Sequence, residues 1–204
     1  MTNQNDTPRW FFDLDRTLYN TEALYDLVRK DLSAHGHTNE EVNDAKKALD
    51  DYTFEGLLAR LGYSPNRIAE MTAHFQRHFS EGNNLLMGNV TKTLRRISET
   101  DECHLLTFGD GRFQKNKYAG LTDLHPFFHE TRFISLGQTK GDILRDAGEG
   151  IVYFVDDAPY QLIDVHEKAP WVTLIRMMWP TFELEPHPED GRLWRVITSI
   201  EELI

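Results

Sequence analysis

Short runs of consecutive apolar residues recur along the chain, and longer segments with helical periodicity separate them. None of the runs alternates cleanly with polar residues, which is typical of strands in a parallel sheet covered by helices on both faces. Each run has the length of a strand and therefore predicts a buried one. The clearest runs are residues 10–12, 103–107, 151–155 and 172–175, and a weaker one is residues 132–135.

Amphipathic patterns lie between these predicted strands. From Val90 to Glu99 apolar residues share one stripe of a helix, and charged residues occupy the opposite face. Residues 138–147 and 159–168 precede the next strands in the same way. This alternation of strand and helix predicts an α/β fold with a doubly wound, Rossmann-like parallel sheet.

Residues 19–88 break this rhythm, because they hold helical patterns and no convincing strand. The helices expected there span residues 21–34, 40–50, 53–61 and 65–79. A helical segment that follows the first strand predicts an all-helical domain inserted into the α/β domain. We therefore expect a core domain formed by residues 1–18 and 89–204, and a helical cap domain formed by residues 19–88.

Composition and charge narrow the classes of function. The 204 residues include 33 Asp and Glu against 22 Lys and Arg, which gives a net charge of −11. This acidic excess argues against binding to nucleic-acid polymers and against docking on an anionic membrane, since both need a basic surface. A single cysteine, Cys103, excludes an intramolecular disulfide. No apolar stretch approaches the ~18 residues of a spanning helix, and residues 1–9 lack a secretory signal pattern, so we expect a cytoplasmic protein.

Polar side chains of types that can bind ligands or take part in catalysis lie at the ends of the first two predicted strands. In open α/β sheets ligands bind at this carboxyl edge. Glycine after a strand also lets backbone N–H groups approach an anion closely. The residues at these two strand ends are Asp13, Asp15 and Thr17 after the first strand, and Thr107, Phe108 and Gly109 at the second.

Two further features belong to the same edge. Lys140 opens a predicted helix, where a lysine opposes the helix dipole and a bound anion would offset that cost. Asp156 and Asp157 end the fourth run, and adjacent carboxylates repel each other unless a cation lies between them. An aspartate-rich turn, a solvated lysine and a helix cap would explain these features singly. Together they predict a site that combines carboxylates, a lysine and a hydroxyl.

The order Asp13-x-Asp15-x-Thr17, Thr107, Lys140, Asp156-Asp157 resembles the haloacid dehalogenase superfamily of hydrolases, most of which are Mg²⁺-dependent phosphatases. The resemblance extends to the core strands and helices, and the inserted helical segment matches the cap that follows the family's first motif. It implies a metal-dependent phosphatase, because the dehalogenases of the superfamily use no metal and do not need the second aspartate.

The resemblance also assigns roles. Asp13 would be the nucleophile and Asp15 the general acid and base, while Lys140 would hold phosphoryl oxygens and shield Asp13 from its acidic neighbours. Mg²⁺ would be the cofactor, and its implied ligands are Asp13, Asp15 with the Leu14–Asp15 backbone, Asp156 and Asp157. The implied substrate- and phosphate-binding residues are Thr17, Thr107, Phe108, Gly109, Lys140 and Arg16.

The sequence departs from the family pattern at three places. Arg16 stands where glycine or asparagine is frequent, Phe108 where asparagine is common, and Tyr160 or Gln161 where an acid is often found. The expected partner is a small phosphorylated metabolite. A nucleoside 5'-monophosphate is suggested by the Thr17-Leu18-Tyr19 continuation, but a sugar phosphate, phosphotransfer of the phosphoglucomutase type and a non-catalytic phosphate-binding protein stay open.

Other features are interpreted as structural. His74 and His78 lie four residues apart, a spacing that can bind metal, but without a glutamate in the motif position we expect ordinary histidines of the cap. Arg112, Lys115 and Lys117 are expected to form a solvated helix face. Residues 179–190, rich in Pro and Glu, are expected to form an exposed loop without an assigned function.

Overall fold

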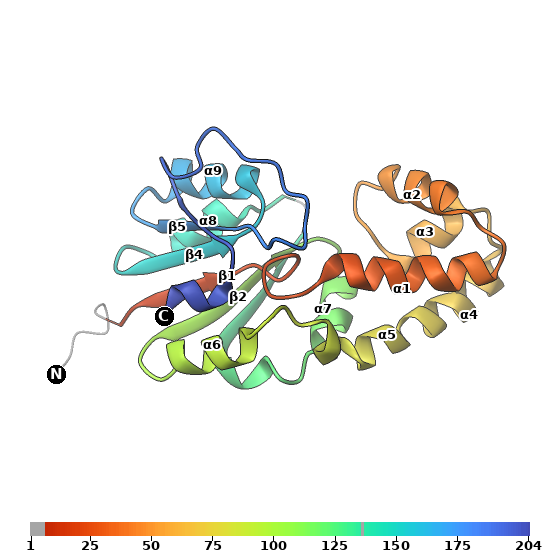
Figure 1. Cartoon of the computed structure of the whole chain (residues 1–204), viewed down its shortest axis with the longest axis horizontal. Coiled ribbons are helices and arrows are strands. Elements are labelled where there is room, and N and C mark those ends of the chain that lie inside the picture. Colours follow the sequence, from red (N-terminus) through yellow and green to blue (C-terminus); the bar gives the residue numbers. More distant parts are fainter. Residues whose placement is uncertain (1–6, 136) are drawn as a thin grey trace.

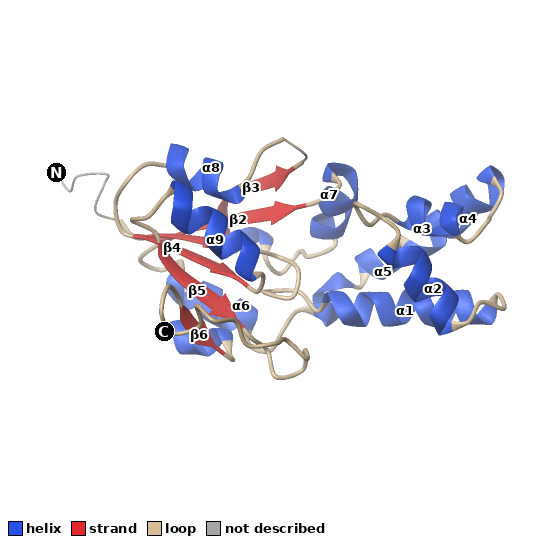
Figure 2. Cartoon of the chain, turned by 90° about the horizontal axis from the view of Figure 1, so that it is seen from above, coloured by secondary structure: helices blue, strands red, loops and turns tan. Residues whose placement is uncertain are grey.

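The protein is described by a computed structural model that covers residues 7–135 and 137–204. Six parallel strands form one sheet in the order β3-β2-β1-β4-β5-β6, as Figure 2 shows from above. The fold class predicted from the sequence is thereby confirmed. The strands are β1 (Arg9–Phe12), β2 (Glu102–Phe108), β3 (Phe128–Ile134), β4 (Val152–Asp156), β5 (Thr173–Met177) and β6 (Arg195–Ile197).

Helices cover both faces of this sheet (Figure 1). On one face, α8 (Lys140–Asp146) and α9 (Pro159–Lys168) pack on an apolar cluster that includes Phe11 and Phe154. On the other, α6 (Val90–Ile97), α7 (Gly111–Ala119) and the 3₁₀ helix η3 (Ile200–Leu203) share a cluster with Trp10 and Phe12. Trp10, Phe11 and Phe12 of β1 thus face alternate layers and all three are buried, which explains the unbroken hydrophobic run at residues 10–12.

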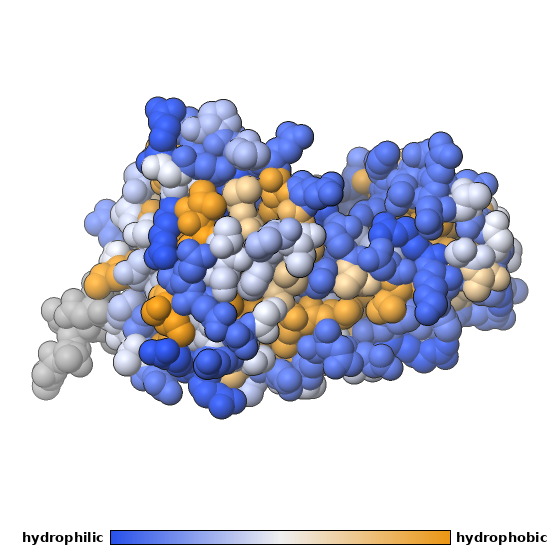
Figure 3. All heavy atoms as spheres, in the orientation of Figure 1, coloured by the Kyte–Doolittle hydropathy of each residue, from blue (hydrophilic) through white to orange (hydrophobic). Residues whose placement is uncertain are grey.

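The remaining helices form a second body beside the sheet, which we call the helical block. It contains α1 (Thr21–Ala34), α2 (Asn39–Lys47), α3 (Phe54–Arg60), α4 (Pro65–Phe75), α5 (Arg77–Ser80) and the 3₁₀ helix η1 (Gly82–Leu85). Its surface is largely hydrophilic in the space-filling view, and the molecule is indented between the block and the sheet (Figure 3). A further 3₁₀ turn, η2 (His125–Phe127), precedes β3.

Two chain segments connect the helical block to the α/β part, and they lie side by side. The Asn20 N–H donates to the Leu85 carbonyl at 2.7 Å, and the Met87 N–H donates to the Leu18 carbonyl at 2.9 Å. The segments that enter and leave the block are therefore hydrogen-bonded to each other. Their position is close to the domain boundaries expected after residues 18 and 88, which stay a prediction.

The helical block also packs directly against α7. Phe113 of α7 lies 5.0 Å from the ring of Phe54 and 5.3 Å from that of Phe79, between centroids. Beside them, a Cβ on Gly120 would come within 1.7 Å of the Phe79 carbonyl oxygen, so the backbone there approaches too closely for any other residue. Aromatic packing and this close approach hold α5 against α7.

Two predicted elements differ from the observed ones. The helix expected over residues 65–79 is two helices, because an i→i+3 bond from the Phe79 N–H to the Gln76 carbonyl tightens the chain between α4 and α5. Phe75 and Phe79 are both buried, so the hydrophobic period continues through the break. The sequence pattern therefore gives no sign that the helix is interrupted. The run at residues 132–135 overlaps the end of β3, an edge strand in which residues 129–131 are polar and at least partly exposed.

Across the described ranges, 7–135 and 137–204, no helix has both the length and the apolar character needed to cross a bilayer.

Candidate active site

Three neighbouring strands bring their polar ends to the same edge of the sheet. Phe12, the last residue of β1, lies opposite Leu105 of β2 and Val155 of β4. The next N–H, that of Asp13, donates to the Val155 carbonyl at 2.9 Å. β4 ends one residue after Val155, at Asp156, and β2 ends three residues after Leu105, at Phe108. The parallel register therefore brings the predicted residues of the three strands to one edge.

Lys140 connects two of these strand ends. Its Nζ donates to Asp13 Oδ1 at 2.5 Å and to Asp156 Oδ2 at 2.6 Å, and all three residues are buried. Burial alone would lower the pKa of Lys140, but the two carboxylates raise it, so the ammonium stays charged. Thr139 caps α8 and fixes Lys140 as its first residue, facing the strand ends rather than solvent.

The carboxylates of Asp13, Asp156 and Asp157 form a compact acidic group. One oxygen from each lies within 4.8 Å of the others. Burial raises the pKa of Asp13 well above its usual range against the pull of Lys140, and burial followed by the charge of Asp156 raises the pKa of Asp157 to about 7. Three carboxylates, two of them buried and that of Asp157 half-buried, outnumber the single lysine, and an all-oxygen donor set of this kind fits a hard divalent cation.

Asp15 is not part of this acidic group, and both oxygens of its carboxylate accept hydrogen bonds. Lys117 Nζ lies 2.6 Å from both oxygens, Gln114 Nε2 donates at 3.0 Å, and the Thr21 hydroxyl donates at 2.5 Å. Burial would raise the pKa of Asp15, but the charge and hydrogen bonds of Lys117, with those of Thr21 and Gln114, lower it. The carboxylate of Asp15 is thus separate from the acidic group of Asp13, Asp156 and Asp157.

Lys117 corrects one expectation from the sequence. Arg112 and Lys115 are exposed as predicted, but Lys117 is 1 % exposed and points into the protein toward Asp15. A signal was present, since Lys117 follows Phe113 by four residues and precedes Leu121 by four, which places it on the apolar stripe of α7. A lysine on a buried stripe needs an acidic partner.

The segment after Asp13 forms a tight turn. The N–H groups of Leu18 and Tyr19 both donate to the Leu14 carbonyl, at 3.0 and 2.9 Å. Arg16 adopts a left-handed conformation, with φ of +57°, and its guanidinium pairs with Glu22 of α1. Glycine and asparagine adopt this conformation at lower cost than arginine, which accounts for their frequency at this position in the family resembled.

The hydroxyl groups of Thr17 and Thr107 are buried without a hydrogen-bond partner in the described part of the chain. An unsatisfied buried hydroxyl is costly, and a bound anion would satisfy it. Gly109 does not fit its expected role through its backbone, because its N–H already donates to the Ile134 carbonyl at 3.1 Å. The absence of a side chain at Gly109 instead makes room for Gln114, whose Nε2 would lie 3.1 Å from a Cβ there.

Residues 179–190 are more than the exposed loop that the sequence predicts. Trp179 is buried and donates its Nε1 to the Thr17 carbonyl at 3.0 Å. Arg176 of β5 is 3 % exposed, donates to the Asp157 carbonyl at 3.3 Å, and holds both oxygens of Asp190 at 2.9 and 2.8 Å. The segment therefore supports two turns of the site. A single arginine inside the apolar run of β5 was the available signal.

Two cavities open on these residues. One, of about 230 Å³, is lined by Asp13, Lys140, Asp156 and Asp157. The other, of about 340 Å³, lies toward the helical block and is lined there by residues of α1, α2 and the α2–α3 connection. The residues that line both cavities are Asp15, Arg16, Phe108 and Tyr160. These four residues therefore form a wall that the two cavities share.

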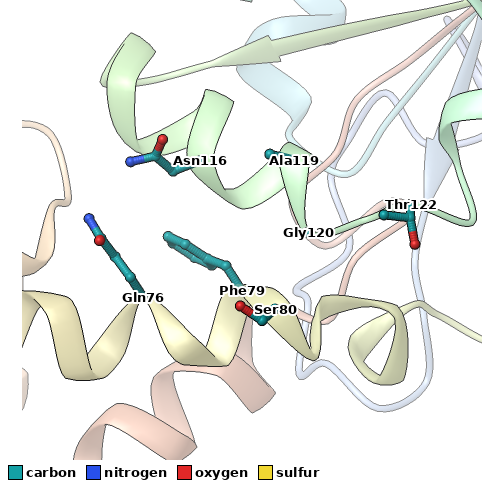
Figure 4. A pocket seen from close by; sticks show the side chains of 7 residues that line it. All are labelled: Gln76, Phe79, Ser80, Asn116, Ala119, Gly120 and Thr122. Atoms are coloured by element: carbon teal, nitrogen blue, oxygen red, sulfur yellow. The ribbon is translucent and has the colours of Figure 1, made fainter.

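A third cavity, of about 430 Å³, lies between α7 and the junction of α4 and α5. Figure 4 shows Gln76 and Asn116 extending toward each other from its two sides, with Phe79 between them. Its lining contains no acidic, basic or histidine side chain, so it offers no equivalent chemistry.

Comparison with solved structures agrees with this geometry. A haloacid dehalogenase-like hydrolase from Burkholderia xenovorans superposes with a TM-score of 0.74, at 14 % identity over 97 % of this chain and 95 % of that one. The chain has the haloacid dehalogenase fold. No protein-family model and no curated protein matches the sequence.

Two further structures with the haloacid dehalogenase fold were solved with bound ions. The hydrolase YfnB from Bacillus subtilis, bound to magnesium, has a TM-score of 0.67 and 16 % identity over 97 % of both chains. A hydrolase from Deinococcus radiodurans with bound phosphate and sodium has a TM-score of 0.61 and 17 % identity, over 98 % of this chain and 94 % of that one. At these identities the likeness establishes the fold, and the chemistry of this chain rests on its own residues.

Proposed function

We propose that this protein is a Mg²⁺-dependent phosphomonoesterase that hydrolyses a small phosphorylated metabolite through a phosphoaspartate on Asp13. The observation that carries the proposal is the position of Lys140, whose Nζ bridges Asp13 and Asp156 beside a small polar cavity. A lysine so placed neutralises charge on a phosphoryl group as it approaches an anionic nucleophile. The acidic group next to it supplies oxygen ligands for a hard cation.

In the first step a carboxylate oxygen of Asp13 attacks phosphorus, and the bond from phosphorus to the leaving oxygen breaks. Asp15, which takes up a proton once it is released from Lys117, gives that proton to the leaving oxygen. In the second step Asp15 accepts a proton from water, which attacks the phosphoaspartate and releases inorganic phosphate and free Asp13. Thr107 and Thr17, whose hydroxyls lack partners in the residues described, would donate to phosphoryl oxygens.

Asp13, Asp156, Asp157 and the Asp15 carbonyl would hold the metal. When bound, Mg²⁺ would neutralise phosphoryl charge and orient the group for in-line attack. Lys140 performs part of the same task, and its charge lowers the pKa of Asp13 against the larger effect of burial. The magnesium bound to YfnB, a structure of the same fold, supports this choice of cation.

Asp15 must leave its present position to act on the leaving group. Its carboxylate is held ionised by Lys117, and one of its hydrogen bonds comes from Thr21, the first residue of α1. Movement of the helical block, the proposed cap formed by residues 19–88, would change that bond directly. Interdomain movement in YfnB supports this step.

The cavity of about 340 Å³, which lies toward the helical block, would hold the leaving group. Its wall combines the rings of Tyr25, Tyr52 and Phe113 with the carboxylates of Asp50 and Asp51. Aromatic faces suit a planar base, and carboxylates suit ribose or sugar hydroxyls. The rings favour a nucleoside 5'-monophosphate as the substrate, with a sugar phosphate as the second candidate.

A panel of nucleoside monophosphates and sugar phosphates, assayed for released phosphate with Mg²⁺ and with EDTA, tests the proposal. We expect turnover with Mg²⁺ only, and its loss in Asp13→Asn. Asp146→Asn, a change at an exposed acid of α8, is the matched control. Turnover that survives both Asp13→Asn and EDTA would refute the mechanism. Tight phosphate binding without turnover of any ester would identify a non-catalytic member of the fold.

A further inference from the structure

A second group of metal-ligating side chains lies in the helical block, away from the proposed active site. His74 Nε2 and His78 Nε2 both meet the same oxygen, Oδ2 of Asp31, at 2.9 and 2.8 Å. Asp31 belongs to α1, His74 to α4 and His78 to α5, so the group connects three helices of the block. The sequence predicted ordinary histidines here, since Asp31 lies more than forty positions away and its approach depends on the fold.

We propose that Asp31, His74 and His78 bind a divalent transition metal ion, with Zn²⁺ as the representative probe. Two imidazoles and one carboxylate suit Zn²⁺, Co²⁺ or Ni²⁺, whereas Mg²⁺ and Ca²⁺ prefer oxygen ligands only. The acidic group near Lys140 contains no imidazole. The two groups therefore differ in the cations that they select.

The geometry needs only a small adjustment. Tetrahedral Zn²⁺ at its usual bond lengths places nitrogen and oxygen ligands about 3.3 Å apart. The present separations of 2.8 and 2.9 Å would widen by about half an ångström, within reach of a rotation of the Asp31 side chain. The three side chains are 19–42 % exposed, so an ion reaches them from solvent and water completes its coordination.

Protons in the metal-free group are arranged by Arg77. Its guanidinium donates to His74 Nδ1, which places the His74 proton on Nε2, where it is directed at Asp31. A metal on Nε2 moves that proton to Nδ1, and Arg77, which is exposed, then turns into solvent. Arg77 thus competes with the metal for His74, both by this bond and by its charge.

The expected consequence is stiffening of the helical block. Metal bonds would connect the last turn of α1 to α4 and α5, where two hydrogen bonds to one carboxylate oxygen now join these side chains. Because α1 begins at Thr21, which holds Asp15, the site would affect how the block moves without contributing to the chemistry.

Calorimetric titration of the untagged full chain with Zn²⁺, in buffer with excess Mg²⁺ to occupy the acidic group, tests the proposal. We expect one Zn²⁺ per chain, with affinity at least tenfold weaker in Asp31→Asn, His74→Gln and His78→Gln, since even the loss of an outer partner costs about 10–100-fold. His35→Gln, a change at an exposed histidine after α1, should bind as wild type does. Arg77→Gln should bind Zn²⁺ more tightly.

Co²⁺ provides a readout that does not depend on affinity alone. Bound to this group, it should give visible absorption bands that disappear in His74→Gln, the most exposed ligand and the variant expected to fold best. Zn²⁺ binding of wild-type strength in all three ligand variants would overturn the proposal, as would no stoichiometric binding to the wild type. Neither result bears on Asp13 or phosphatase activity, so this proposal fails independently of the proposed function.

Discussion

Lys117 Nζ lies 2.6 Å from both carboxylate oxygens of Asp15, and Lys117 is buried to 1 % exposure. The pair joins α7 of the α/β part to the turn that leads into the helical block. It holds Asp15 ionised and away from the acidic group of Asp13, Asp156 and Asp157. Lys117 does not line the cavity of about 230 Å³, yet it determines the position and the charge of Asp15, the residue proposed to exchange protons.

Replacing Lys117 by Met should destabilise the fold and slow turnover. Removing one partner of a buried pair costs about 3–5 kcal/mol, and the partial exposure of Asp15 reduces this to about 1–3 kcal/mol. Without the ammonium, burial raises the pKa of Asp15. Urea unfolding and kcat at saturating substrate measure both effects. Lys115→Met, on the exposed side of α7, should change stability by less than about 0.5 kcal/mol. Equal stability of the two variants would contradict a structural role for the pair.

The difference between Lys117 and Lys140 shows where sequence reasoning works. Asp13 directly follows β1, whereas Thr107 and Asp156 lie in the last residues of β2 and β4, and the parallel register brings these strand ends together whatever the helices do. Lys140 is the first residue of α8, the helix that precedes β4, so its position could also be predicted from the order of elements along the chain. Lys117 reaches Asp15 only through the orientation of α7, and Asp31 meets His74 only through the packing of three helices. Such contacts between distant segments depend on tertiary packing that periodicity does not encode.

The left-handed backbone at Arg16 predicts an unusual stability series. A non-glycine residue in this conformation costs about 1 kcal/mol relative to glycine. Arg16→Gly should therefore be more stable than Arg16→Ala by about 1 kcal/mol, because both lose the pair with Glu22 and only alanine keeps the strain. Thermal unfolding measures the order. An alanine variant as stable as the glycine variant would show that the turn carries no strain.

Asp190 should make the free energy of unfolding depend on pH in the acidic range. Its bonds to Arg176, Trp194 and the His187 N–H lower the pKa of Asp190 despite burial. A lowered folded-state pKa stabilises the fold above the ordinary aspartate pKa, and this contribution is lost as pH falls through the folded value. Asp190→Asn should thus cost about 1–3 kcal/mol at pH 7 and less below about pH 4. Urea unfolding at both pH values measures this, with exposed Glu183→Gln as control. A difference that does not change with pH would contradict it.

Magnesium should stabilise the protein through the acidic group. A ligand at 100 times its dissociation constant adds about 2.7 kcal/mol to the free energy of unfolding, or about 5–10 °C for a chain of this size. Asp157→Asn removes one of three converging carboxylates and should abolish most of this shift. Thermal unfolding with Mg²⁺ and with EDTA measures it. The same Mg²⁺ shift in Asp157→Asn as in the wild type would place the ion elsewhere.

Lys46 predicts a pH dependence of substrate binding. Its Nζ lies 3.3 Å from the centroid of the Tyr25 ring, in the wall of the cavity of about 340 Å³. Burial lowers the pKa of Lys46 to about 8. The ammonium is charged at pH 7 and loses its proton through pH 8, so attraction for an anionic substrate falls across that range. KM should rise about 3- to 10-fold from pH 7 to 9, which corresponds to about 1 kcal/mol for a half-buried charge. Lys46→Met should already show the higher KM at pH 7 and no such rise, whereas exposed Lys47→Met should follow the wild type. Parallel profiles for Lys46→Met and the wild type would exclude Lys46 from substrate binding.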